Sequence, residues 1–392
     1  MRIGIDATTW WNGRGFGRFT RDLLQAMFRQ DGHQFVLFVD QPPCKEMLVP
    51  NVQVVQVETS APVTVTAVSN GNRSLCDILR FRASVRRERL DLMYFPAVYS
   101  WFPVGPGIPN IVTFHDAIAE RFPDLVVPNW RGRFFWNAKT WLAKRTASHI
   151  VTVSNSAADE ISTYLAVPPE LISVIYEAAG PEFAPVVAPE RREALRSKLG
   201  LRSDRRYILY VGGIAPHKNL DNLVRAFSLV CGERAFADLD LVFTGDPKGS
   251  GFLSSHGSLL RCINEHPAAK NRVHFTGFVS DSELPTLYSD ALMTAMPAFS
   301  EGFGLPALEG LACGTPVMAT ADGAVAEIAD NAGLYFDPYD IESIATTIRR
   351  IAGDVQLLET LRARCVPRAA EFNWDRSARS LLDVFNCVRE QI

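Results

Sequence analysis

Residues 205–230 read RRYILYVGGIAPHKNLDNLVRAFSLV and indicate the fold most clearly. A run of apolar and aromatic residues leads into a glycine pair, Gly212 and Gly213, and apolar residues then recur at helical spacing. This order is typical of a buried strand, a tight turn and an amphipathic helix, which together open a βαβ unit. The stretch therefore predicts the start of a domain built on a parallel sheet.

The same order opens the chain, where RIGID precedes a glycine loop and the amphipathic stretch RFTRDLLQAMFRQ. We therefore expect an α/β protein with two Rossmann-like domains that face each other across a central cleft. Residues 1–185 and 186–371 form the two predicted domains, a helix at 372–392 packs back on the first, and 178–203 is a hinge. Further strands are predicted at 34–39, 92–96, 110–116, 149–154, 239–246, 272–279, 291–299 and 315–320.

Length, composition and charge exclude several classes of protein. The 392 residues are too many for one ordinary core, and 47% apolar with 21% charged residues is typical of a soluble globular protein. The net charge of -3 does not indicate the basic surface of a nucleic-acid binder. Seven cysteines without a CxxC pair argue against a disulfide framework or a structural zinc site. Without a signal sequence or a stretch of about 20 apolar residues, we expect a cytoplasmic protein. Contact with the inner face of the membrane stays open.

A second stretch, SEGFGLPALEGLACGTPV from Ser300, carries two glutamates around a glycine and proline turn. The turn follows a predicted strand, and ligands of doubly wound sheets bind at that end of the strands. Its glycines allow close backbone approach, and the N-terminus of the following helix favours an anion such as a phosphate. Carboxylates accept hydrogen bonds, so Glu301 and Glu309 predict a sugar and a ribose beside that phosphate. For Glu309 alone, a favourable interaction with the helix dipole is the alternative.

Residues 300–340 resemble the nucleotide-sugar site of retaining glycosyltransferases of family 4, the group 1 glycosyltransferases, which have the GT-B fold. The resemblance implies that Glu309 binds the ribose hydroxyls of the donor and that Glu301 binds hydroxyls of the transferred sugar. It also implies that backbone amides hold the sugar and the diphosphate. These amides belong to Gly302, Phe303, Gly304 and Leu305.

Lys218 stands just before a predicted helix in YVGGIAPHKNL, where it can reach a diphosphate as a point charge. The resemblance gives Lys218 that role, with Gly213 in the adjoining turn. An exposed lysine near a helix start is the alternative. Many relatives carry an arginine in this turn, which this chain lacks, and His217 and Arg18 are the two candidates for the missing cation.

The N-terminal glycine loop NGRGFGRFTRDLL precedes a helix that we expect to open at Thr20 or Arg21. Its G-x-G-x-G spacing puts Arg18 where the dinucleotide fingerprint needs a third glycine. An NAD-type oxidoreductase with Asp40 as its ribose acid is therefore weakly supported. The resemblance implies instead that the loop, with Gly17 and Arg18, closes over the donor phosphates and sugar.

His115 ends a predicted strand, and the resemblance implies that it contacts the transferred sugar, whereas a structural histidine is the alternative. The resemblance also implies that base recognition uses backbone atoms near Phe278 and Val279. The chain has no HExxH motif, no D-x-D that follows a strand and no motif-supported Ser-His-Asp constellation. We therefore predict no metal site, and a reaction that depends on electrostatic stabilisation of the leaving group.

Together with the absence of a metal motif, the resemblance implies a retaining, metal-independent transfer of a hexose from a nucleotide-diphosphate sugar to a glycan or lipid-linked glycan. The donor is expected to resemble GDP-mannose, and beyond this co-substrate no cofactor is expected. The resemblance implies that the leaving phosphate acts as the base. A catalytically silent nucleotide-sugar-binding protein, an NAD-type oxidoreductase and a GT-B phosphorylase are the alternatives.

The stretch RGRFFWNAKTWLAKR, residues 131–145, is basic and aromatic and contains no acid. Two interpretations stay open for it. The helix lies on an anionic membrane or meets a lipid-diphosphate acceptor, or it buries its aromatic side chains in the domain core and leaves its basic residues outside.

Overall fold

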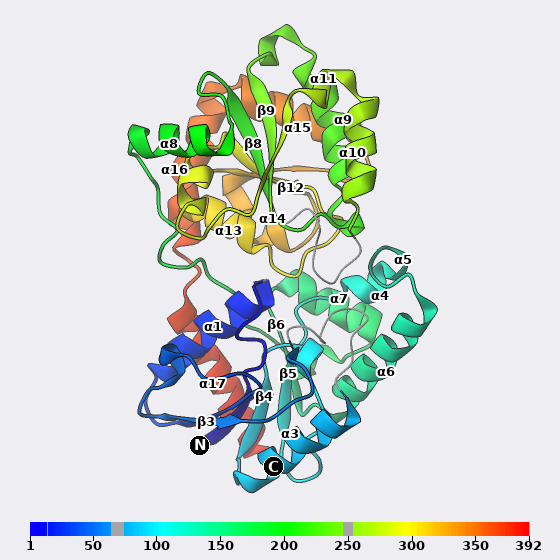
Figure 1. Ribbon diagram of the computed structural model, residues 1–392, viewed down its shortest axis with the longest axis vertical. Helices are drawn as coiled ribbons and strands as arrows, with labels where there is room; N and C mark the ends of the chain where they lie inside the picture. The colour runs from blue at the N-terminus through cyan, green and yellow to red at the C-terminus, as the bar shows by residue number, and fades with distance from the viewer. Residues whose placement is uncertain (14, 64–73, 246–253, 392) are drawn as a thin grey trace. The chain divides into compact units, whose positions relative to one another are not determined.

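The computed structural model describes residues 1–13, 15–63, 74–245 and 254–391 and separates into two compact units (Figure 1). Unit 1 comprises Met1–Glu177 and Asn373–Ile392, and unit 2 comprises Ala178–Phe372. Each unit is a parallel sheet with helices packed on it, so the prediction of two Rossmann-like domains is confirmed. The division after Glu177 falls before the predicted boundary at residue 185.

Unit 1 contains a seven-stranded sheet in the order β3-β2-β1-β4-β5-β6-β7, and every strand pair in it is parallel. Two of these strands, β3 and β7, were not predicted, because their residues are only partly buried and lack long apolar runs. The strands are β1 (Arg2–Asp6), β2 (Gln34–Val39), β3 (Val52–Gln56), β4 (Leu92–Phe95), β5 (Asn110–Thr113), β6 (His149–Thr152) and β7 (Ile172–Val174). The helices are α1 (Gly15–Phe28), α3 (Leu75–Arg87), α4 (Ile118–Arg121), α5 (Pro123–Val126), α6 (Trp130–Thr146), α7 (Asn155–Leu165) and α17 (Trp374–Glu390), with 3-10 turns η1 (Lys45–Met47), η2 (Val98–Ser100) and η3 (Pro169–Leu171).

Unit 2 contains a six-stranded parallel sheet in the order β10-β9-β8-β11-β12-β13. Its first strand, β8, lies between β9 and β11, so the chain reverses its direction of strand addition there, as at β1 in unit 1. The strands are β8 (Arg206–Val211), β9 (Leu239–Thr244), β10 (Val273–Gly277), β11 (Met293–Met296), β12 (Val317–Thr320) and β13 (Gly333–Phe336). Residue 246, at the end of one predicted strand, lies outside the described residues. The helices are α8 (Pro189–Leu199), α9 (Leu220–Cys231), α10 (His256–Glu265), α11 (Pro267–Lys270), α12 (Leu284–Asp290), α13 (Leu305–Ala312), α14 (Ala324–Ala329), α15 (Ile341–Gly353) and α16 (Val355–Ala369), with 3-10 turns η4 (Pro216–Lys218), η5 (Arg234–Phe236) and η6 (Asp330–Ala332).

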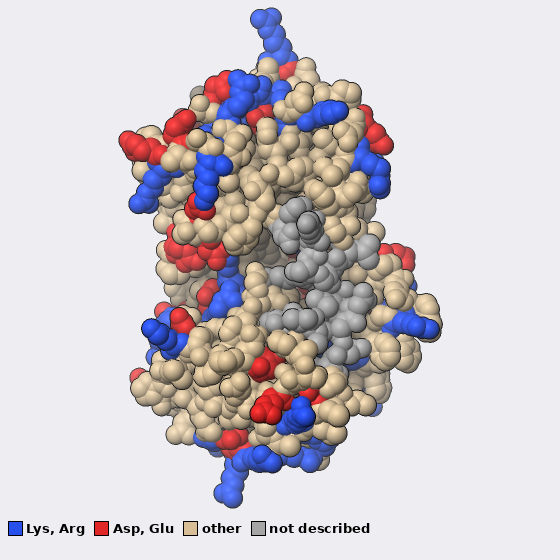
Figure 2. Space-filling view, in the orientation of Figure 1, with Lys and Arg blue, Asp and Glu red and all other residues tan. Residues whose placement is uncertain are grey.

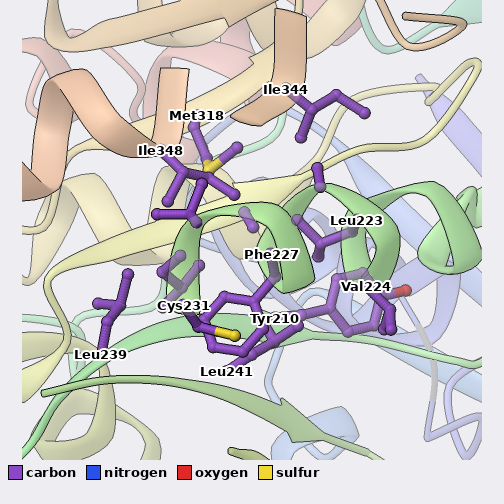
Figure 3. Close-up of a cluster of buried hydrophobic side chains, with 14 of the residues drawn as sticks. Tyr210, Leu223, Val224, Phe227, Cys231, Leu239, Leu241, Met318, Ile344 and Ile348 are labelled. Carbon is purple, nitrogen blue, oxygen red and sulfur yellow. The ribbon is translucent and has the colours of Figure 1, made fainter. Parts of the chain in front are cut away.

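The core of unit 2 forms where α9 and α15 cover one face of the sheet (Figure 3). Leu223 and Phe227 of α9 are fully buried beside Leu241 of β9, and Ile344 and Ile348 of α15 complete the cluster. The spacing of these side chains matches one face of a helix, which is why the stretch at 205–230 folds as predicted. Removal of this apolar surface from water holds the helices on the sheet and so fixes the strand ends that carry the loops.

The C-terminal helix α17 belongs to unit 1 and packs against α1. Asp375 pairs at 2.7 Å with Arg29, the residue that follows α1, and the Phe385 ring lies 5.2 Å from the Tyr94 ring of β4. Asn373 caps the helix by accepting hydrogen bonds from the amides of Asp375 and Arg376. The predicted hinge at 178–203 is wrong in part, because it contains α8.

Charges of both signs are interspersed on the visible face of each unit (Figure 2). In the part of the chain that the structure describes, no helix is both long enough and apolar enough to cross a bilayer.

Candidate functional site

Lys218 and Glu301 form a close ion pair at the carboxyl end of the unit 2 sheet. The Lys218 Nζ atom donates to both carboxylate oxygens of Glu301 at 2.8 Å. The two side chains are 21% and 15% exposed, so the pair is partly shielded and open to solvent on one side. The structure therefore brings together the predicted diphosphate lysine and the predicted sugar-binding acid.

Sheet order explains this meeting, because the residues follow neighbouring strands. Lys218 ends η4 after β8, and Glu301 follows β11, which pairs with β8 through Met293 and Ile208. This is the point where strand addition reverses, the usual ligand position in doubly wound sheets. The Phe299 amide also donates to the His217 carbonyl at 3.0 Å and ties the two loops together.

Asn219, which the sequence analysis did not single out, fixes the lysine loop. Its backbone is left-handed with φ 58°, a conformation that asparagine tolerates. Its buried side-chain amide donates to the carbonyls of Pro297 at 3.1 Å and Pro338 at 2.9 Å. The sequence signal was an asparagine directly before a helix, but its two acceptors lie far along the chain. Asn219 is therefore a positioning residue for Lys218.

The loop from Glu301 to Gly304 leads directly into α13, which begins at Leu305. Gly304 has φ 99°, and a Cβ on it would lie 2.7 Å from Val325 Cγ2, so the turn requires glycine. The positive end of the helix dipole therefore lies at this loop. The helix expected to follow this turn is α13, which ends at Ala312.

Glu309 lies inside the packing of α13 rather than at the mouth of the loop. It is 2% exposed, and its Oε2 accepts a hydrogen bond from the Tyr288 hydroxyl at 3.0 Å. Tyr288 lies on α12 and was not identified from the sequence, because it belongs to no recognisable motif. The pair fixes the carboxylate, and the ribose role of Glu309 stays a prediction.

The turn after β8 has one exposed and one buried side. Gly213 is exposed, and a Cβ on it would meet nothing within 4 Å. Its carbonyl accepts a hydrogen bond from the Tyr210 hydroxyl at 2.7 Å, and burial together with nearby Glu301 raises the pKa of Tyr210 well above its usual value.

Burial and neighbouring Lys218 lower the pKa of His217 to about 3. His217 is therefore neutral near pH 7 and does not supply the positive charge of the missing arginine.

Residues 278 and 279 follow β10, and their side chains point to different environments. Phe278 is 81% exposed, whereas Val279 is buried in a core cluster with Leu284 and Leu287. Base recognition by the backbone at Val279 stays a prediction.

The glycine loop of unit 1 differs from its prediction. Helix α1 begins at Gly15 and not at Thr20 or Arg21, so Gly17 and Arg18 lie in its first turn. A Cβ on Gly17 would lie 2.0 Å from the Asn12 carbonyl oxygen, so this glycine is required by packing alone. Arg21 donates to the same carbonyl at 3.0 Å. The helix starts early because the loop folds back on its first turn.

His115 contacts two protein groups at the carboxyl end of the unit 1 sheet. Its Nε2 lies 2.9 Å from the Pro96 carbonyl, and its Nδ1 lies 3.6 Å from Oε1 of Glu177. Burial raises the pKa of Glu177, while His115 and Arg18 oppose that rise. Both ring nitrogens therefore face protein partners, and the sugar contact predicted for His115 stays untested. Glu177 was missed because it follows β7, which was not predicted.

Two family models together span almost the whole chain. Residues 13–182 match Glycosyltransferase Family 4, and residues 191–372 match Glycosyl transferases group 1. The second match includes Lys218, Glu301 and Glu309.

Known proteins with similar sequences and structures agree with these matches. The chain is 27% identical to the serotype-specific mannosyltransferase WbdA of Escherichia coli. The aligned region covers 70% of this chain but only 33% of WbdA. It is 28% identical to the O-antigen chain mannosyltransferase B of Escherichia coli, covering 71% of this chain and 70% of that one. The structure of the sucrose-phosphate synthase of Thermosynechococcus elongatus superposes on this chain with a TM-score of 0.76 at 18% identity, and the match covers 100% of each chain. At this identity the similarity shows the fold alone.

The repeated strand-turn-helix pattern, the two parallel sheets and the acids around α13 agree with both family matches. The chain belongs to the family 4, group 1 glycosyltransferases and has their GT-B fold.

Proposed function

We propose that this protein is a retaining, metal-independent glycosyltransferase. It moves a mannose-type hexose from a nucleotide-diphosphate sugar to a glycan or lipid-linked glycan acceptor. The observation that carries the proposal is the pairing of Lys218 with Glu301 beside the N-terminus of α13. A cation, a helix dipole and a hydroxyl-binding acid are the groups that a sugar diphosphate needs.

In the proposed reaction the bond between the anomeric carbon and the diphosphate oxygen breaks. The acceptor hydroxyl oxygen forms the new bond on the same face of the sugar, and its proton passes to the leaving phosphate. Lys218 and the amides at the start of α13 stabilise the charge that develops on the diphosphate. Glu301 accepts hydrogen bonds from the sugar hydroxyls and holds the anomeric carbon in place. The roles of Gly17, Arg18 and His115 toward the donor stay predictions.

The sugar is proposed from the relatives. WbdA and O-antigen chain mannosyltransferase B are both named mannosyltransferases. A GDP-mannose donor and a polysaccharide or lipid-linked acceptor are consistent with those names. Cytoplasmic location is part of the same proposal.

The first test is a thermal-shift panel of GDP, UDP, dTDP and ADP with their common sugar conjugates, with and without EDTA. Ligands that bind only the folded state raise the unfolding temperature by mass action, by an amount that grows with the logarithm of the ratio of ligand concentration to Kd. We expect GDP and GDP-mannose to stabilise the protein equally well in EDTA. The Lys218→Ala variant should lose this response, whereas Lys270→Ala, which changes a lysine on α11, should keep it.

Three results would redirect the proposal. A response to another nucleotide would change the donor, and loss of the response in EDTA would contradict metal independence. Stabilisation by NADH alone would favour the oxidoreductase alternative. If GDP-mannose binds but is not consumed with any glycan acceptor, the silent binding protein becomes the better interpretation. An inverted anomeric configuration in the product, measured by proton NMR, would contradict retention.

A further inference from the structure

Helix α6 carries an exposed aromatic face that the proposed reaction does not use. Four aromatic side chains of α6 are largely exposed: Trp130 at 71%, Phe134 at 65%, Trp141 at 56% and Phe135 at 54%. Leu142 is exposed beside them. The interpretation that this helix buries its aromatic residues in the core is therefore wrong for Phe134, Phe135 and Trp141, whereas Trp136 is partly buried and packs against the core of unit 1.

The exposed side chains form one continuous face. At 3.6 residues per turn, they fall within an arc of roughly 140° around the helix axis. The same arc contains the exposed residues Arg131, Ala138 and Arg145. We call this set of eight residues, 130, 131, 134, 135, 138, 141, 142 and 145, the α6 face.

The opposite side of α6 fastens the helix to unit 1. Trp136 stacks near Tyr99 with ring centroids 5.1 Å apart, and its indole N–H donates to Glu120 at 2.8 Å. Lys139 donates to the Tyr99 carbonyl, and Lys144 donates to the Leu165 carbonyl. The helix lies on the outside of its unit, with α4 and α5 near its N-terminal end (Figure 1). Its exposed face is thus held outward by a well-anchored inner face.

Charge distinguishes this face from an ordinary apolar patch. Residues 130–146 include five Lys or Arg residues and no acid. Arg131 and Arg145 stand near the two ends of the face, and the Arg131 guanidinium lies 5.4 Å from the Trp130 ring centroid. The nearby exposed acid Asp124 is paired with Arg133 at 2.8 Å. The α6 face is therefore locally cationic and aromatic, although the whole chain has a net charge of -3.

We propose that the α6 face docks on the surface of a bilayer that contains anionic lipid. The α6 face extends for roughly 20 Å along one helix, which suits a helix that lies in the plane of the membrane–water interface. Tryptophan rings settle at the headgroup level, phenylalanine and leucine enter the acyl boundary, and arginines pair with lipid phosphates. The inference does not depend on the donor or on turnover.

The test is co-sedimentation of the full chain with vesicles of phosphatidylcholine alone and of phosphatidylcholine with phosphatidylglycerol. We expect binding to the anionic vesicles that weakens with added salt. The variant Trp130→Ser/Phe134→Ser/Trp141→Ser should lose at least about tenfold in partition coefficient, since it removes three inserting side chains. Its unfolding temperature should stay unchanged, because all three residues are exposed.

A charge variant and a matched control make the result specific. Arg131→Glu/Arg145→Glu should lose the preference for phosphatidylglycerol while keeping its aromatic side chains. Leu260→Ser/Val355→Ser changes two exposed apolar residues of unit 2 and should bind as the wild type does. Vesicle binding that is equal in all four proteins, or absent in the wild type, would overturn the proposal.

Sedimentation velocity without lipid distinguishes the other occupants. If the wild type self-associates and the serine variant is monomeric, the α6 face is an interface between copies of this chain. If soluble glycan protects Trp130 and Trp141 from fluorescence quenching and anionic vesicles do not, the face binds acceptor sugar. Either outcome would replace the membrane proposal.

Discussion

Lys218 and Glu301 neutralise each other, because the lysine Nζ lies 2.8 Å from both carboxylate oxygens. The proposed function gives these groups different ligands, the diphosphate and the sugar. In the proposed donor complex the phosphate oxygens compete with the Glu301 carboxylate for the Lys218 ammonium group, and we expect one carboxylate hydrogen bond to be exchanged for a phosphate hydrogen bond. Charge-assisted hydrogen bonds are strong, so this exchange affects how tightly the leaving group is held.

Glu301→Gln should bind free nucleoside diphosphate more tightly and turn over the donor more slowly. Removing the competing carboxylate releases Lys218, which we expect to raise affinity by about 3- to 30-fold. Turnover should fall at least about tenfold, because the sugar loses a strong acceptor. Calorimetric titration with GDP and single-turnover assays measure the two effects. Glu342→Gln on α15 is the control, and weaker GDP binding in Glu301→Gln would contradict the exchange.

Glu309→Ala and Tyr288→Phe together separate ligand binding from packing at α13. Glu309→Ala leaves the buried Tyr288 hydroxyl without this acceptor and should lower the free energy of unfolding by about 1–3 kcal/mol. If Glu309 also binds the ribose, donor affinity should fall by at least about tenfold in this variant. Tyr288→Phe keeps the carboxylate and should change donor affinity by less than about threefold. Equal donor affinity in both variants and the wild type would assign Glu309 a structural role.

Asn219→Ala should weaken catalysis through Lys218 without removing any ligand contact. The change removes two hydrogen bonds to Pro297 and Pro338 and places alanine at φ 58°, so we expect a loss of about 1–3 kcal/mol in unfolding free energy. The value of kcat should fall more than GDP affinity. Asn222→Ala, which removes a bond to the same Pro338 carbonyl, is the control. Unchanged turnover in Asn219→Ala would argue against the positioning role.

Glu120→Gln should stabilise the protein above neutral pH. Burial raises the pKa of Glu120 from 4.5 to about 7, so the folded state holds its proton more tightly than the unfolded state does. The contribution of Glu120 to the free energy of unfolding therefore falls as pH rises from about 4.5 to 7 and is constant above that. Glutamine keeps an acceptor for the Trp136 indole and has no charge to bury. We expect a gain of about 2–3 kcal/mol at pH 8 and little change at pH 4.

Denaturant unfolding at both pH values measures this difference. Glu359→Gln, an exposed change on α16, should behave as the wild type does at each pH. A gain of equal size at pH 4 and pH 8 would show that Glu120 does not titrate between them.

Gly17→Ala should destabilise unit 1, whereas Gly13→Ala should not. The new Cβ would lie 2.0 Å from the Asn12 carbonyl oxygen, whereas a Cβ on Gly13 meets nothing within 4 Å. The backbone must shift to accommodate Gly17→Ala, with an expected loss of about 1–3 kcal/mol in unfolding free energy. Thermal unfolding of both variants checks this. Equal unfolding temperatures would mean that the first turn of α1 is not held against Asn12.

The pattern of residues was sufficient to predict much of the fold. Residues 205–230 specify a strand, a turn and a helix through local apolar spacing, and the same order near the N-terminus specifies a second domain. Strands β3, β7 and β13 were missed because partly buried edge strands carry a weak apolar signal. Helix α1 begins earlier than expected because Gly17 packs on a carbonyl that no local pattern identifies.

Local sequence was enough to identify the chemical groups that follow the strands, since Lys218, Glu301 and Glu309 stand beside turns with clear glycine and proline signals. Which of them meet depends on the tertiary structure. Lys218 and Glu301 are 83 residues apart and touch because β8 and β11 are neighbours in the sheet. The tertiary structure likewise determines that Glu309 is buried against Tyr288, that Glu177 faces His115 and that α6 turns most of its aromatic residues outward. Local propensity fixes each element, whereas strand order and the choice of buried face depend on long-range packing, which no short stretch contains.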